Sequence, residues 1–191
     1  VAISATADRS GCLVLDDRGR VHCYGSARHS GDLTQLGRSI IPVDISATPR
    51  GYGYWIIDTI GSVYAFGGAE YCDGVPQVTN DASEPVCVRA NPAGSGYWIM
   101  DRRGGVCAFG SASFNGPLAE YVDTRRLEIV DFAPAPRGKG YWMVDSIGGV
   151  FALGDAEFLG APTEHGSVDT VALIADGDGY LVIDRRGAIL S

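Results

Sequence analysis

A motif repeated five times along the chain constrains the fold more than any other feature. It joins Gly-Tyr-Trp to a later Asp-x-x-Gly turn and a Phe-Gly ending, and it is clearest from Gly53, Gly96 and Gly140. A diverged copy begins at Gly11 and a shorter one at Gly179. The turn aspartates, at intervals of 42, 43, 44 and 39 residues, are Asp16, Asp58, Asp101, Asp145 and Asp184. A period of about 40–45 residues built from short strands is typical of propeller blades.

Each repeat predicts a small antiparallel sheet. The copy from Val130 contains the apolar stretches VDFAPAP, GYWMVD and GVFALG, which predict three strands, and AEFLG, which predicts a weaker fourth. The turn aspartate is expected to accept backbone N–H groups, and the turn glycine to supply a positive φ. The second strand is apolar on both faces, so neighbouring sheets should cover it on both sides.

We therefore expect an all-β protein, a small β-propeller of about five blades with three to four antiparallel strands each and an incomplete last blade. Residues 1–191 are expected to form one domain, and the ring is expected to close imperfectly. A linear solenoid or a two-sheet stack remains the alternative. The predicted repeats are 1–42, 43–85, 86–129, 130–168 and 169–191.

Composition and charge exclude several function classes. The formal net charge of −8 argues against a nucleic-acid partner, which would require a clustered basic surface. No apolar run approaches the roughly 20 residues that a membrane span needs, and no export signal is visible at the start. No recognisable nucleophile elbow or zinc-type spacing occurs, and an isolated Asp-x-x-Gly supplies too few oxygens for calcium. We expect no catalytic residue, no metal site and no cofactor.

The five cysteines cannot all pair within one chain. Cys72 and Cys87 flank the longest insert between repeats and would staple it in an oxidising compartment, with a free pair as the equal alternative. Whether Cys12 and Cys23 share a face depends on the hairpin register. Cys107 stands where other copies have Tyr or Phe, which suits a small buried hydrophobe.

The copies such as GYWIIDTIGSVYAFGGAEY resemble the Gly-Tyr-Trp…Asp-Gly-Gly-Val-Phe-x-Phe-Gly-Asp-Ala repeats of secreted or surface proteins of actinobacteria. This resemblance spans essentially the whole chain and implies a propeller-like module at an extracellular or cell-surface location. The first copy is more loosely similar to repeats of the chromosome-condensation-regulator class. The later copies lack the Gly-Gln-Leu-Gly ending of that class, so a nucleotide-exchange role does not follow.

The Tyr-Trp pairs of the three clearest copies have two interpretations. Aromatic rings between blades would stack on sugar rings, which predicts a glycan-binding cleft. Alternatively, the two side chains point to opposite faces of a central strand and pack between blades, and we favour this core interpretation. The first and last copies have Leu13 and Leu181 in place of Trp, which fits packing better than a site in every blade.

One face of the predicted propeller should gather charged and variable loops. The second-to-third strand hairpins and the connections between blades are expected there, and variation on one rim of a repeated scaffold is typical of a binding surface. A solvated arginine edge is the competing interpretation. The candidate binding residues are Asp17, Arg18, Arg102, Arg103, Arg185, Arg186 and Asp73, together with the insert from Asp73 to Pro85.

The sequence thus predicts a non-catalytic binding or assembly module that presents loops for a protein partner or a larger assembly, such as a virion. A glycan-binding, lectin-like surface module is the first alternative. An enzyme with a site assembled from loops of several blades is the second.

Overall fold

The computed structural model describes residues 2–74, 84–166 and 168–190. Within these ranges the chain forms five three-stranded antiparallel sheets, each built from consecutive strands. The strands are β1 (Ala2–Ala5), β2 (Gly11–Leu15) and β3 (Val21–Gly25); β4 (Pro42–Ala47), β5 (Gly53–Asp58) and β6 (Val63–Gly67); β7 (Pro85–Ala90), β8 (Gly96–Asp101) and β9 (Val106–Gly110); β10 (Ile129–Pro134), β11 (Gly140–Asp145) and β12 (Val150–Gly154); and β13 (Thr170–Asp176), β14 (Gly179–Asp184) and β15 (Ile189–Leu190).

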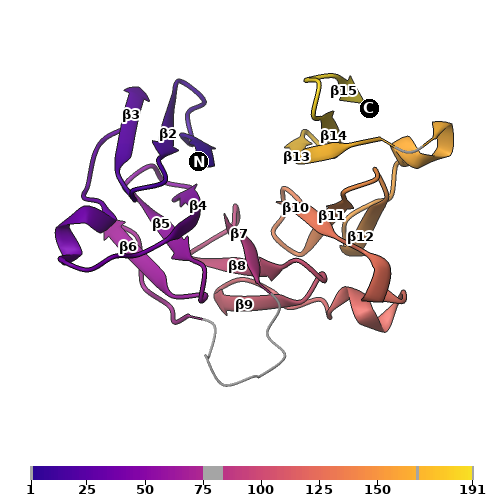
Figure 1. Ribbon diagram of the computed structural model, residues 1–191, viewed down its shortest axis with the longest axis horizontal. Coiled ribbons are helices and arrows are strands. Elements are labelled where there is room, and N and C mark those ends of the chain that lie inside the picture. Colours follow the sequence, from indigo (N-terminus) through magenta and orange to yellow (C-terminus); the bar gives the residue numbers. More distant parts are fainter. Residues whose placement is uncertain (1, 75–83, 167, 191) are drawn as a thin grey trace.

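The sheets stand side by side as the blades of an arc (Figure 1). The first strand of each blade lies innermost and contacts the first strand of the next, from β1 to β4, β7, β10 and β13. Within the described ranges, the first and last blades make no comparable contact, so the arc is open between them. This radial arrangement is that of a β-propeller, and neither a linear solenoid nor a two-sheet stack is formed. No described helix has the length and apolar character that a bilayer crossing requires.

The predicted fourth strand does not form in any described part of the chain. Stretches such as 156–160 are irregular, and the connections between blades contain only short 3-10 helices. Each third strand ends at one end of its sheet, whereas the first strand of the next blade begins at the other end. The connection between them therefore runs back along the outer flank, and it does so without forming a strand. The helices are η1 (Leu33–Leu36), η2 (Leu118–Glu120), η3 (Thr124–Arg126) and η4 (Pro162–His165).

The Asp-x-x-Gly turns have the predicted structural role. In the third blade, Asp101 Oδ1 accepts the backbone N–H of Arg103 and of Gly105, each at 2.8 Å. Gly104 supplies the positive φ, 78°. The same pair of backbone bonds recurs at the other four turn aspartates, which explains why this residue type returns in every repeat.

Tryptophan and tyrosine join successive blades, as the core interpretation predicts. The Trp98 ring packs on Tyr141 of the next blade, with centroids 6.2 Å apart, and both side chains are fully buried. Trp98 Nε1 donates to the Ser113 carbonyl at 2.8 Å, and the Tyr141 hydroxyl donates to the Gly116 carbonyl at 3.0 Å. Each side chain thus holds the connection between two blades in place by a hydrogen bond. Matching ring pairs are Trp55 with Tyr97 and Trp142 with Tyr180.

Buried charges tie the inner strands together. The Arg89 guanidinium bridges the carboxylates of Asp44 in the second blade and Asp131 in the fourth. Each carboxylate also accepts a backbone N–H of the following blade, from Val88 at 3.0 Å and from Leu173 at 2.8 Å. Because all of these bonds cross from blade to blade, the network fixes how neighbouring inner strands are aligned.

All five cysteines are unpaired in the structure. Cys72 packs in the joint between the second and third blades, whereas Cys87 is buried in the joint between the third and fourth, so the proposed staple is not formed. The register pairs Cys12 with Tyr24 and Leu13 with Cys23, which places the first two cysteines on opposite faces of the sheet. Cys107 is only half-buried, less than predicted.

Candidate functional site: a basic hollow on the bend face

The blades present two rims. The turn face carries the Asp-x-x-Gly hairpins between second and third strands, and the bend face, at the opposite end, carries the bends between first and second strands. Four of the bends lie at residues 6–10, 48–52, 91–95 and 135–139. The candidate residues predicted from the sequence lie mainly on the turn face, whereas the hollows lie mainly on the bend face.

The predicted residue pairs Asp17-Arg18, Arg102-Arg103 and Arg185-Arg186 do lie on the turn face, in the first, third and fifth blades. Their charged partners are local. Arg102 Nη1 contacts Glu128 Oε1 at 2.8 Å, and Arg185 Nε contacts Asp169 Oδ2 at 2.9 Å. These are exposed ion pairs, which contribute little to stability. The remaining members, at exposed positions of the same turns, are Asp17, Arg18, Arg103 and Arg186.

Asp73 is separate from these turns. Its carbonyl accepts the Tyr97 hydroxyl, and its φ of 113° is unusual for a residue other than glycine. It lies on the outer flank between the second and third blades. Most of the insert that follows, residues 75–83, lies outside the described residues. The structure therefore places the predicted site residues on separate blades and does not assemble them into one cavity.

The bend face contains two adjoining hollows that share one bend. The first, about 460 Å³, lies between the first and second blades, and the second, about 440 Å³, lies between the second and third. Arg50 and Tyr52 line both. A short bend that projects between two hollows can present its side chains to a ligand seated in either one.

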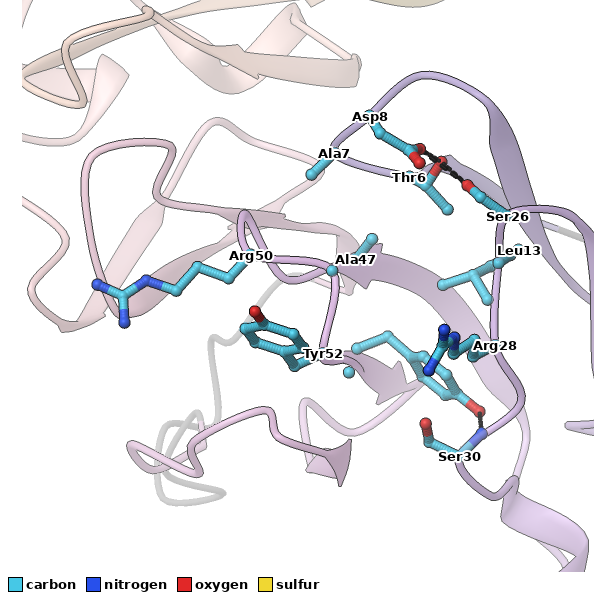
Figure 2. Close-up of a pocket in the computed structure, with 14 residues that line it drawn as sticks. Thr6, Ala7, Asp8, Leu13, Ser26, Arg28, Ser30, Ala47, Arg50 and Tyr52 are labelled. Atoms are coloured by element: carbon cyan, nitrogen blue, oxygen red, sulfur yellow. Dashed lines mark hydrogen bonds between the residues drawn. The ribbon is translucent and has the colours of Figure 1, made fainter.

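Three exposed side chains dominate the first hollow. The Tyr52 ring is 73% exposed and lies between the side chains of Arg50 and Arg28 (Figure 2). Neither arginine forms an ion pair with another described residue, and both are exposed. Two arginines that form no ion pair in the described part of the chain thus flank an exposed aromatic ring, on a protein whose net charge is −8. The arrangement suits a carboxylate-bearing ligand, because guanidinium binds carboxylate in a bidentate manner.

The one acidic group of this hollow is already satisfied. Asp8 accepts the hydroxyls of Thr6 at 2.6 Å, Ser10 at 2.7 Å and Ser26 at 2.8 Å, and the Ser10 backbone N–H at 3.0 Å. These hydrogen bonds, that from Thr6 foremost, hold the pKa of Asp8 well below its usual range. Asp8 therefore stays charged while it holds the 6–10 bend and the Ser26 loop together, and it forms no ion pair with Arg28 or Arg50.

The corresponding hollow between the fourth and fifth blades has the opposite charge. It measures about 300 Å³, and three carboxylates line it with a single arginine, Arg137. The acidic residues are Asp155, Glu157 and Asp178. Equivalent joints of the propeller thus offer different chemistry: the hollow at the first joint has two arginines and an exposed tyrosine, whereas the hollow at the fourth joint is lined mainly by carboxylates.

Sequence reasoning missed the bend face. Its signal was present in Arg50-Gly51-Tyr52-Gly53, where a large aromatic residue stands in a glycine bend outside the apolar strand pattern. The other four bends have Ser10, Ser95, Lys139 and Asp178 at that position, so Tyr52 is the exception. The contribution of Arg28 could not have been found, because the connection after β3 brings it to the hollow from another blade.

No family model and no curated protein matches the chain. Solved structures do match its fold. A protein of unknown function from Bacteroides thetaiotaomicron is 13% identical with a TM-score of 0.62, over 98% of this chain and 57% of its own. The β-propeller domain of Cps50 (Swd1) from Myceliophthora thermophila is 11% identical with a TM-score of 0.60, over 97% and 62%. Chaetomium thermophilum Raptor is 12% identical with a TM-score of 0.57, over 97% and 18%.

These similarities establish the class: the chain is a β-propeller protein. At such low identity they show the fold and nothing of a specific activity. The chain spans 18%, 57% and 62% of the lengths of those three structures. Among the described residues, no group of three or more His, Cys, Asp or Glu side chains is arranged to hold a metal ion.

Proposed function

We propose that the protein is a non-catalytic interaction module whose bend face binds a carboxylate-bearing segment of another protein or of a larger assembly. The observation that carries this proposal is the placement of Arg28 and Arg50, neither of which forms an ion pair with a described residue, on either side of the exposed Tyr52 ring. Tyrosine and arginine, together with tryptophan, are enriched among energetically important interface residues. Structures with the same fold include the Cps50 propeller and Raptor, which supports a scaffold role at this coarse level.

A glycan is the second candidate ligand, and Tyr52 is also the observation that favours it. The three repeat tryptophans are buried, with their indole N–H groups bonded to carbonyls, so they do not line sugar-binding clefts as open platforms. Tyr52 is a large ring in a hollow whose face is open to solvent. A secreted or surface location, proposed from the repeat resemblance, would suit either ligand.

An array of 12-residue peptides of graded Asp and Glu content, read beside a glycan array, tests the proposal. We expect acidic peptides to bind, and to bind more weakly as salt increases, because exposed ionic contacts are screened. Tyr52→Ala should weaken binding about tenfold or more, as for a central interface aromatic. It should leave the free energy of unfolding within about 0.5 kcal/mol of the unsubstituted protein, since the ring is exposed.

Matched charge controls separate the two rims. The double variant Arg28→Ala with Arg50→Ala removes two positive charges from the bend face, and Arg18→Ala with Arg186→Ala removes two from the turn face. Loss of peptide binding in the first pair alone supports the proposal. Loss of peptide binding in the second double variant alone would assign binding to the turn face. Binding on the glycan array alone would show that the ligand is a sugar and not a protein segment.

A further inference from the structure

The joint between the first and second blades lacks a tryptophan. In the next three joints, a buried tryptophan at the third position of the second strand packs on the tyrosine of the following blade, as Trp98 does on Tyr141. In the first blade, Leu13 holds this position of β2 and packs in one apolar cluster with Tyr54 of the second blade. Leucine is smaller than tryptophan and has no N–H group, so no indole lies between these two blades.

The first joint also has a hydrogen-bond acceptor without its usual donor. Three residues after the glycine that ends the third strand, a carbonyl accepts the indole N–H in each of the other joints. These carbonyls belong to Glu70 at 2.8 Å, Ser113 at 2.8 Å and Glu157 at 2.7 Å. In the first blade the same position after Gly25 is Arg28, and its carbonyl accepts no hydrogen bond from the described residues. The first joint therefore keeps the acceptor but not the donor.

The first hollow reaches the layer that the tryptophans close in other joints. Leu13 and Tyr54 both line it, together with Arg28 (Figure 2). In the second and fourth joints the hollow is lined by Trp55 or Trp142, and the tyrosine on which each ring packs does not line it. Leu13 and Tyr54 are buried, so they form an apolar floor beneath the charged rim of the first hollow.

We propose that the first hollow binds a tryptophan side chain of the acidic partner segment, seated on Leu13 with its N–H donated to the Arg28 carbonyl. The tryptophan site rests on the proposed function of this face and adds the side chain that lies beside the carboxylates bound by the arginines. An aromatic anchor in a desolvated pocket is typical of the residues that dominate interface affinity. The described ends of the chain lie away from the hollow: Ala2 pairs with Leu15 at the turn-face end of β2, and Leu190 belongs to the fifth blade.

A pair of capped 12-residue peptides tests the proposal on the ligand side. The first has one tryptophan with two glutamates on each side and glycine and serine elsewhere, and the second has alanine in place of the tryptophan. Titration calorimetry at low salt should show the tryptophan peptide binding at least about tenfold more tightly, as for an aromatic side chain that anchors an interface. Equal binding of both peptides would overturn the tryptophan site and leave the acidic-segment proposal standing. Binding of neither peptide would overturn both.

Leu13→Trp tests the protein side, because it gives the first blade the side chain that the next three blades have. The new indole should occupy the hollow and donate to the Arg28 carbonyl. It should weaken binding of the tryptophan peptide at least about tenfold while leaving that of the alanine peptide unchanged. Leu181→Trp, at the same position of the fifth blade, is the matched control and should bind both peptides normally. Equal weakening of both peptides by Leu13→Trp would show no coupling between residue 13 and the peptide's tryptophan, and would overturn the proposal.

Methyl NMR on the unsubstituted protein keeps the test decisive if Leu13→Trp fails to fold. With isotope-labelled leucine methyl groups, the Leu13 signals are those that are missing from Leu13→Ile. The ring current of a seated indole should shift these signals when the tryptophan peptide is added, whereas the alanine peptide should leave them in place. Unshifted Leu13 signals with the tryptophan peptide bound would place its ring elsewhere and overturn the proposal.

Discussion

The joints between blades and the bend face are built from the same repeats. The joints that contain a tryptophan repeat the same aromatic contacts from blade to blade, whereas the charged residues of the bend face differ. At the joints, Trp98 and its equivalents are buried and bonded to the next connection in the same way each time. On the bend face, one hollow is flanked by Arg28 and Arg50, whereas another is lined mainly by carboxylates. The comparison indicates that the joints hold a common frame, on which each rim segment can change its charge without altering how the blades pack.

The largest expected effect tests the joints. Trp98→Ala should lower the free energy of unfolding by about 3–5 kcal/mol, as for other large-to-small substitutions of buried aromatic residues. Chemical denaturation followed by circular dichroism measures this change. A loss of unfolding free energy below about 1 kcal/mol would show that Trp98 contributes no more to stability than an exposed rim residue, and would contradict the distinction between the two regions.

A smaller effect is expected at the tyrosine hydroxyl. Tyr97→Phe removes the bond to the Asp73 carbonyl and the acceptor for the Cys72 backbone N–H, while leaving the buried ring in place. We expect a loss of about 1–2 kcal/mol, because polar groups in the connection lose their partner. The denaturation midpoint of Tyr97→Phe, compared with that of Tyr52→Phe, shows whether the hydroxyl matters only at the joint. If Tyr97→Phe had the same denaturation midpoint as Tyr52→Phe, the stability of the connection would not depend on this hydrogen bond.

The smallest effect concerns pH and the turn face. Although burial opposes it, hydrogen bonds from Arg20, His22 and Arg18 hold the pKa of Asp16 well below its usual range. A carboxyl whose pKa is lower in the folded state stabilises the fold fully above its unfolded pKa of about 4, and this contribution is lost progressively as the pH falls from there through the folded pKa. Asp16→Asn should therefore be less stable than the unsubstituted protein at pH 7, and the gap should narrow toward pH 3 in thermal unfolding. A stability difference that stays the same from pH 7 to pH 3 would show that the charge of Asp16 does not contribute to it.

Much of the frame was predictable because it is local or periodic. The turn role of Asp101 follows from its spacing to Gly104, and the burial of Trp98 follows from its place on a strand that is apolar on both faces. The predicted repeat boundaries fall at or beside the starts of β4, β7, β10 and β13. The fourth strand was predicted from short apolar stretches such as AEFLG, but these have no partner edge once the connection runs along the outer flank.

The candidate site was less accessible to sequence reasoning. Arg28 and Tyr52 belong to different repeats and meet only because one blade packs beside another (Figure 2). The arginine pairs that the sequence suggested are conspicuous as pairs, yet Arg102 and Arg185 form ion pairs with nearby carboxylates. Their role as a binding surface stays a prediction. Charge runs are visible in a sequence, whereas the absence of a neutralising partner depends on the packing of separate segments.

The tyrosine that pins each connection also has a mechanical consequence. Tyr97 and Tyr141 each bond to the segment leading into their own blade from the one before, so these bonds hold a blade to its immediate neighbour. A chain held in this way transmits tension serially. If the two ends were drawn apart, every joint would carry the same load, so the weakest joint would open first and the molecule would lengthen repeat by repeat.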